Sequence, residues 1–221
     1  SSRRRHTRYI SVTGVQTCAL PISRVGVGAG IVEVQKTFAP LFGAEDVAAD
    51  GSAFDDLWAD GARIPLGGLE IQVIATPGHT PACVSYRIGD AVFVGDTLFM
   101  PDFGTARCDF PGGDARTLYA SIQRILGLPD ETRVFVGHDY PAGAGRAEPA
   151  WETTVLAQRN NKHLKDGTDE AAFVQMRTTR DSGLDAPALL VPALQVNIRG
   201  GRLPPADADG QVRLRLPVKM G

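Results

Sequence analysis

The sequence predicts an α+β fold in which a β-sheet is covered by helices. Short apolar runs separated by Gly-rich turns fill the middle of the chain, and helical periodicities dominate its later part. Three of the strand-like runs end in corners that carry a histidine or an aspartate. This order of elements is typical of a layered fold, and 221 residues fit one domain.

The expected strands are bounded by turn residues. We expect six of them, at residues 24–28, 62–66, 69–75, 83–88, 91–95 and 133–137. Two glycines separate the second strand from the third, and a Gly-Asp pair separates the fourth from the fifth. Each of these two pairs therefore predicts a hairpin.

The expected helices follow from a 3.6-residue apolar period. We expect four of them, at residues 31–42, 114–126, 148–164 and 168–180. Asp114 and Thr168 are the expected N-caps of the second and the fourth. Residues 48–60 are expected to form a polar loop, and the Pro-rich tail from residue 187 is expected to be irregular.

The first two dozen residues differ in character from the rest. Residues 1–24 carry five arginines and no acid, without helical or strand periodicity. This stretch resembles a translated sequencing-adapter read, and a basic targeting peptide is the alternative. We therefore treat residues 1–23 as a non-native segment and residues 24–221 as the domain, and His6 receives no functional role.

Charge and cysteine content exclude several classes of function. Without those five arginines the chain has 18 basic and 25 acidic residues, a net charge of −7 that argues against nucleic acid as a partner. Three cysteines without a CxxC pair are typical of the reducing cytoplasm. No apolar run approaches the roughly 18 residues of a membrane-spanning helix, so a membrane location is not expected.

Candidate metal ligands follow three of the predicted strands. His79 lies in Thr-Pro-Gly-His-Thr, Asp96 in Gly-Asp-Thr and His138 in Gly-His-Asp-Tyr. Imidazole and carboxylate together suit Zn(II) or Fe(II). Taken singly, a histidine after a strand is more often a surface residue and an aspartate after glycine a turn residue. Cys83 and Cys108 are interpreted as ordinary small apolar residues.

The ordered set of motifs carries the family resemblance. TPGHT, GDTLF seventeen residues on and GHDY forty-two residues later resemble the later metal motifs of the metallo-β-lactamase superfamily. GTARCDFPGGDARTLYASIQRIL and PALQVNIRGG resemble its persulfide dioxygenase branch, which includes β-lactamase-hydrolase-related proteins. The resemblance implies a four-layer αββα sandwich, here incomplete at the N-terminus, because the sequence has no HxHxDH motif.

The resemblance also implies a set of metal ligands. His79 and Asp96 match two of the three ligands of a single Fe(II), and the third, the first histidine of HxHxDH, has no counterpart here. His138 matches a second metal position that persulfide dioxygenases leave empty. No catalytic residue separate from the metal centre is expected.

The implied substrates are glutathione persulfide and O2, converted to sulfite and glutathione by a cytoplasmic enzyme. Arg107 and Tyr140 match positions that hold the glutathione moiety, and Asp109 is an expected indirect partner of the centre. Arginine suits this role because its fork pairs with a carboxylate at two points. We also consider a homodimer, although no residue pattern indicates one.

Two alternatives remain open at this point. The first is a glyoxalase II-like thiolester hydrolase with two Zn(II) ions, in which Asp96 bridges both metals and His138 is a working ligand. The second is a non-catalytic domain without metal. The absence of HxHxDH favours inactivity of the chain as printed, even if the family is enzymatic.

Overall fold

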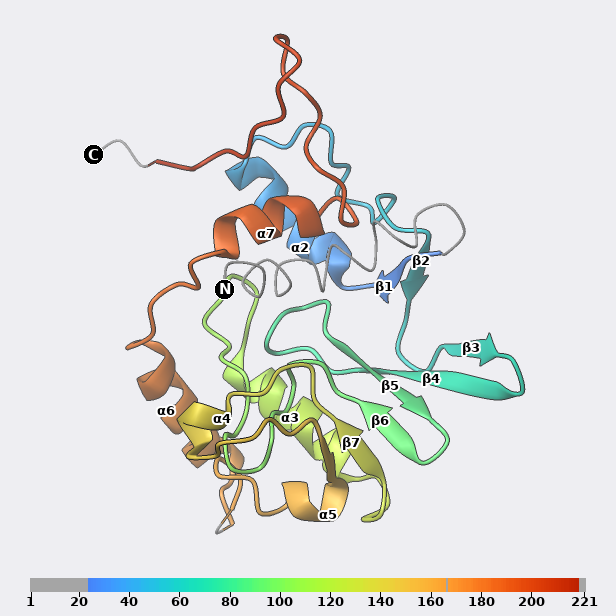
Figure 1. Cartoon of the computed structure of the whole chain (residues 1–221), viewed down its shortest axis with the longest axis vertical. Coiled ribbons are helices and arrows are strands. Elements are labelled where there is room, and N and C mark those ends of the chain that lie inside the picture. Colours follow the sequence, from blue (N-terminus) through green and yellow to red (C-terminus); the bar gives the residue numbers. More distant parts are fainter. Residues whose placement is uncertain (1–23, 166, 219–221) are drawn as a thin grey trace. The chain divides into compact units, whose positions relative to one another are not determined.

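The computed structural model describes residues 24–165 and 167–218, so the predicted non-native segment at 1–23 lies outside the described residues. The chain divides into two compact units, one built from Trp58–Asp185 and the other from the segments on either side of it. The α+β class is confirmed, with helices and two sheets (Figure 1). No helix in this part of the chain is long and apolar enough to cross a membrane.

The larger unit is built on a six-stranded sheet in the order β3-β4-β5-β6-β7-β8. Its strands are β3 (Arg63–Leu66), β4 (Leu69–Ala75), β5 (Val84–Ile88), β6 (Ala91–Phe93), β7 (Arg133–Phe135) and β8 (Glu152–Thr154). Both predicted hairpins are confirmed, with Leu66 opposite Leu69 and Ile88 opposite Ala91. All neighbouring strands are antiparallel except β6 and β7, which are parallel.

Strand direction decides where the polar corners meet. Since β5 is antiparallel to both β4 and β6, and β7 is parallel to β6, the strands β4, β6 and β7 run in the same direction. Their carboxyl ends therefore lie at the same end of the sheet, and the loops that follow them start there, with β5 between β4 and β6. The three predicted ligands lie in these loops.

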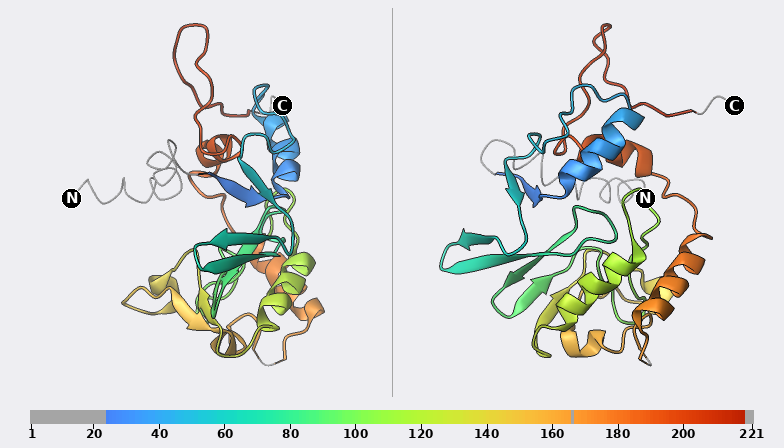
Figure 2. Two further views of the ribbon diagram at one scale, coloured as in Figure 1. Left: turned by 90° about the vertical axis from the view of Figure 1, so that its right-hand side faces the viewer. Right: turned by 180° about the vertical axis from the view of Figure 1, so that it is seen from behind.

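Helices α3 (Ala115–Leu126), α5 (Val155–Gln158) and α6 (Glu170–Asp181) belong to the same unit, and α3 and α6 lie on one side of the sheet (Figure 2). The predicted face of α3 is confirmed: Leu118, Ile122 and Ile125 are fully buried. They form one core with Val92 and Val134 of the sheet. Asp114 caps α3 as predicted, by accepting a hydrogen bond from the Thr117 N–H.

Two sequence predictions in this unit are wrong. Residues 148–164 do not form one helix, because Glu152–Thr154 pairs with β7 as β8 and only Val155–Gln158 is helical. The N-cap of α6 is Asp169, not Thr168. The carboxylate of Asp169 accepts from the Ala172 N–H, whereas the Thr168 hydroxyl donates to the Lys165 carbonyl.

The smaller unit contains a two-stranded sheet and two longer helices. Its elements are β1 (Gly26–Gly28), β2 (Asp56–Trp58), α2 (Ile31–Leu41) and α7 (Leu190–Asn197), while α4 (Pro141–Ala144) belongs to the larger unit. The predicted helix at 31–42 is confirmed. The expectation of an uninterrupted loop at 48–60 is corrected by β2, and the expectation of an irregular tail is corrected by α7. Pro192 is compatible with α7 because it lies in the first turn, where a missing N–H costs no hydrogen bond.

Candidate metal centre

His79 is held in one orientation by a hydrogen bond to the backbone. Its side chain is only 17% exposed, and its Nδ1 lies 2.6 Å from the backbone carbonyl of Arg107. A carbonyl only accepts, so Nδ1 carries the proton and the lone pair is on Nε2. That Nε2 lies 3.7 Å from a carboxylate oxygen of Asp96. Metal-bound histidines commonly donate their other ring N–H to a carbonyl in this way.

Gly78 lets the loop after β4 lie directly against helix α3. Its φ of +134° belongs to glycine, and an added Cβ would lie 2.4 Å from the backbone of Leu118. The Gly78 carbonyl accepts from the Asp114 N–H, and the Pro77 carbonyl accepts from the Ser121 hydroxyl. The loop that carries His79 is thereby fixed to the first turns of α3.

Asp96 and His138 meet at the ends of the parallel strands β6 and β7. The Gly137 N–H donates to the Gly95 carbonyl, which joins the two loops. His138 Nδ1 then lies 2.5 Å from Asp96 Oδ1, and this hydrogen bond raises the pKa of His138. His138 is 57% exposed on its side chain, whereas Asp96 is 25% exposed.

The three predicted ligands thus lie together, with Asp96 between the two histidines. Their imidazole and carboxylate donors fit a Zn(II) or Fe(II) site in chemical type. Among residues 24–165 and 167–218, however, no group of three or more His, Cys, Asp or Glu side chains is arranged to hold a metal ion. The residues present therefore fit part of a metal centre and not a complete one.

Arg107 is engaged within the protein. Its Nε and Nη2 donate to both carboxylate oxygens of Asp109 at 2.6 Å, and its Nη1 donates to the carbonyl of Asp185 at 2.8 Å. Its Nη2 also donates to the Leu184 carbonyl. The hydrogen bond between the partners lowers the pKa of Asp109 and raises that of Arg107. Asp109 is thus linked to the candidate ligand His79 through Arg107, whose carbonyl holds the His79 ring.

Tyr140 stands at the exposed end of an aromatic cluster. Its side chain is 44% exposed, and its ring stacks on Phe103 with centroids 4.7 Å apart. His138 lies on Tyr140 at 6.3 Å, and Phe99 contacts it edge-on at 5.4 Å. The Tyr140 ring is therefore held beside the His138 ring by its contacts with Phe99 and Phe103.

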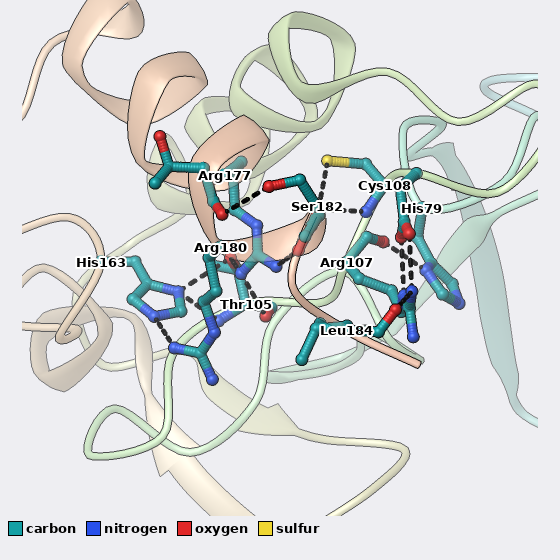
Figure 3. Close-up of polar contacts among 12 residues, drawn as sticks. His79, Thr105, Arg107, Cys108, His163, Arg177, Arg180, Ser182 and Leu184 are labelled. Carbon is teal, nitrogen blue, oxygen red and sulfur yellow. Dashed lines mark hydrogen bonds and ion pairs between the residues drawn. The ribbon is translucent and has the colours of Figure 1, made fainter. Parts of the chain in front are cut away.

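A buried polar network behind the site was missed by sequence reasoning (Figure 3). Arg177 and Asp181, one turn apart on α6, form an ion pair with side chains 1% and 4% exposed. Asp181 accepts from the Cys108 N–H at 2.9 Å, and Arg177 donates to the Thr105 carbonyl. In the sequence, the four-residue spacing of Arg177 and Asp181 at a helix end is the one pattern that indicates this ion pair. The pair fastens the loop on both sides of Arg107, whose carbonyl positions His79.

His163 belongs to this network, although the predicted helix at 148–164 would have included it. It is 7% exposed and lies outside any helix, with its ring against Gly104. A Cβ at Gly104 would lie 2.3 Å from the imidazole, so glycine is needed there for this close approach. Nδ1 of His163 accepts from the Thr105 N–H at 3.0 Å.

Burial of His163 predicts an acid-dependent loss of stability. Desolvation, followed by the charges of Arg177 and Arg180, lowers its pKa from 6.5 to about 3. Below pH 6.5 His163 binds a proton in the unfolded chain but stays neutral in the folded chain. Its contribution to the free energy of unfolding is therefore fully present above pH 6.5 and is lost as the pH falls toward 3. Between pH 7 and pH 5 we expect a loss of about 2 kcal/mol from this group.

Urea denaturation of the unmodified chain and of His163→Gln at both pH values measures this contribution. The carboxylates titrate in both proteins, so the difference between the two pH dependences isolates His163. Equal pH dependences would contradict the prediction.

Comparison with known proteins agrees with this fold and this order of motifs. Residues 26–138 match the profile of the metallo-beta-lactamase superfamily. "Glyoxylase B2" of Dictyostelium discoideum is 49% identical over 216 residues, covering 96% of this chain and 73% of that protein. The chain belongs to the metallo-beta-lactamase superfamily.

Two further similar proteins are matched over only part of their length, which limits the properties that can be inferred from them for this chain. The "beta-lactamase hydrolase-like protein" of Agrobacterium fabrum is 52% identical over 197 residues, which are 89% of this chain and 45% of that protein. The crystal structure of ETHE1 from Myxococcus xanthus has a TM-score of 0.60 and 33% identity, over 68% of this chain and 63% of that one. The chain thus spans about half the length of one relative and under two thirds of the other.

Proposed function

We propose that the chain carries the site of a persulfide dioxygenase that depends on one Fe(II). The observation that carries the proposal is the orientation of His79, whose Nδ1 is held by the Arg107 carbonyl while Nε2 faces Asp96 at 3.7 Å. The motifs of the dioxygenase branch and the likeness to ETHE1 at 33% identity support it.

His79 and Asp96 would hold the iron together with a third ligand from an HxHxDH motif, which this sequence lacks. When bound, Fe(II) supplies the redox chemistry that joins dioxygen to sulfur. Glutathione persulfide, O2 and water give glutathione, sulfite and two protons, so both atoms of dioxygen end on the terminal sulfur. The persulfide is oxidised and dioxygen is reduced.

The residues around the metal position would bind and orient the substrate. The Tyr140 hydroxyl would donate a hydrogen bond to the peptide or the sulfur of the glutathione moiety. Phe99 and Phe103 would provide an apolar surface beside the substrate. Arg107 remains a predicted substrate contact. To bind a substrate carboxylate, its guanidinium group would first have to release the carboxylate of Asp109.

Oxygen uptake with glutathione persulfide, measured alongside metal content, tests the proposal. The assay compares the chain as printed with a chain in which an HxHxDH segment precedes residue 24. About one iron per chain and oxygen consumption in the completed protein are expected, with weaker metal retention in the printed chain. Absence of oxygen uptake in the iron-loaded, completed protein would contradict the proposal.

Asp96→Ala is expected to weaken metal binding by roughly 100-fold or more, because it removes the carboxylate between the two histidines. Titration with Fe(II) under anaerobic conditions, or with Co(II) by absorbance, measures the affinity. Asp90→Ala is the matched control, since Asp90 lies in an exposed hairpin turn at the opposite end of β6. Equal affinities of the two variants would remove Asp96 from the site.

A dinuclear thiolester hydrolase is the second candidate, favoured by one observation. The two carboxylate oxygens of Asp96 face different histidines, His79 at 3.7 Å and His138 at 2.5 Å, so that this carboxylate could serve two metal positions. The printed names of the Dictyostelium and Agrobacterium relatives agree with a hydrolase. Two Zn(II) per chain with hydrolysis of S-lactoylglutathione would support this candidate over the dioxygenase.

A further inference from the structure

The peptide group that joins Arg107 to Cys108 is held at both of its ends (Figure 3). Its carbonyl oxygen, which belongs to Arg107, accepts a hydrogen bond from Nδ1 of His79 at 2.6 Å. Its N–H, which belongs to Cys108, donates to a carboxylate oxygen of Asp181 at 2.9 Å. Because a peptide group is planar and rigid, the position of one end determines the position of the other. The His79 ring is therefore connected to the Asp181 carboxylate through one rigid unit.

The Asp181 end of this connection is shielded from water. Cys108 is 7% exposed and Asp181 is 4% exposed, and the Cys108 thiol donates to the same carboxylate oxygen at 3.6 Å. Without that carboxylate, the Cys108 N–H would be a buried donor that has lost its acceptor, which is costly. The loop would have to shift to bring this N–H to a new acceptor, and the Arg107 carbonyl would move with it.

The end of helix α6 fixes the loop on either side of this peptide group. The Asp181 carboxylate is held by its ion pair with Arg177, one turn away on the same helix. Arg177 also donates to the Thr105 carbonyl at 3.2 Å. On the other side, the Arg107 guanidinium donates to the Asp185 carbonyl at 2.8 Å, just beyond the helix. The orientation of the peptide group is therefore set by residues of α6 and the segment that follows it.

The carboxylate also makes the carbonyl a better acceptor. Hydrogen bonds in a chain polarise one another, so a charged acceptor on the N–H of the Arg107–Cys108 peptide group strengthens the bond that its oxygen accepts from His79. Metal-bound histidines often donate their second ring N–H directly to a carboxylate. Here a peptide group stands between the histidine and the carboxylate and links the two.

We propose that Asp181 is a positioning residue for His79, which it holds through the Arg107–Cys108 peptide group. It keeps the ring proton on Nδ1 and the Nε2 lone pair directed toward the metal position, where Nε2 lies 3.7 Å from Asp96. The hold on the ring is a property of the metal-free chain. Its consequence for metal affinity rests on the proposed function.

Two double variants test the hydrogen bond separately from the ion pair. Both contain Arg177→Met, which avoids leaving an unpaired buried cation. One combines it with Asp181→Leu and the other with Asp181→Asn. The two new side chains are uncharged and similar in size, but only the amide has an oxygen that accepts from the Cys108 N–H. The Asp181→Asn double variant is therefore the matched control.

Nitrogen-15 NMR of the His79 ring in the metal-free chain reports which ring nitrogen carries the proton. Under mildly alkaline conditions, the Nδ1–H form is expected in the unmodified chain and in the Asp181→Asn double variant, and a mixture of tautomers in the Asp181→Leu double variant. Titration with Co(II), followed by absorbance, is expected to show roughly 10- to 100-fold weaker binding in the Asp181→Leu double variant, the range for loss of a group that orients a metal ligand.

Urea denaturation distinguishes positioning from a merely structural role. The Asp181→Asn double variant buries an amide group beside apolar side chains, so it is expected to be the less stable of the two. A structural role of Asp181 would give the weaker Co(II) binding to the less stable variant. The proposal predicts the opposite order.

Two outcomes would overturn the inference. One is an unchanged Nδ1–H tautomer in the folded Asp181→Leu double variant. The other is an equal loss of tautomer and affinity in both double variants, which would assign the effect to the charges of the ion pair. Neither outcome touches the proposed function. A changed tautomer with unchanged Co(II) affinity would support the hold on His79 and contradict the proposed metal site.

Discussion

Replacing Asp181 by alanine is expected to lower the free energy of unfolding by about 3–5 kcal/mol, the range for a buried ion pair that loses one partner. Arg177 would keep its charge at 1% exposure, and among the described residues its remaining hydrogen-bond acceptors would be the Thr105 carbonyl and hydroxyl. Its Nε already lacks a partner among the described residues. The Cys108 N–H would lose its acceptor as well. A loss of this size is a large part of the stability of a typical domain.

Chemical denaturation of Asp181→Ala beside Asp209→Ala measures this effect. Asp209 also pairs with an arginine four residues away, but both side chains are about half exposed, so its removal should have little effect. The double replacement Arg177→Met and Asp181→Leu should recover most of the stability, because it removes both charges and fills the space with apolar groups. A small effect of Asp181→Ala, equal to that of Asp209→Ala, would show that the pair is not buried in solution.

Gly78→Ala is the second change with a large expected effect, about 3 kcal/mol or more from backbone strain and overpacking together. The Cβ would lie 2.4 Å from both N and Cα of Leu118, and backbone atoms do not move aside as a flexible side chain does. The loop would have to leave α3, which breaks the bond from the Asp114 N–H to the Gly78 carbonyl. His79, the next residue, would move with the loop.

The expected signature of Gly78→Ala is a lower midpoint of urea denaturation together with weaker metal binding. Gly68→Ala is the matched control, since nothing lies within 4 Å of a Cβ at that hairpin turn. Its stability and metal affinity should stay close to those of the unmodified chain. If Gly78→Ala and Gly68→Ala behave alike, the loop that carries His79 is not fixed against α3 as described.

Local sequence patterns were sufficient to predict the elements in which turn residues, apolar period and cap all indicate the same structure. The Gly67-Gly68 and Gly89-Asp90 turns predicted both hairpins, and the apolar face of residues 114–126 with Asp114 as cap predicted α3. The prediction at 148–164 failed because β8 has only three residues. Its strand conformation comes from pairing with β7, where Thr154 lies opposite Arg133, and a helical period in sequence contains no information about that partner.

Sequence by itself determined the residue types of the candidate centre and their order, because three strand-like runs each end in a His or Asp corner. Only the tertiary structure decided that these corners meet, since the common direction of β4, β6 and β7 depends on strand pairing between distant segments. It also decided that His163, Arg177 and Asp181 are buried. Burial and charge pairing depend on which surfaces pack together, and local periodicity does not specify them.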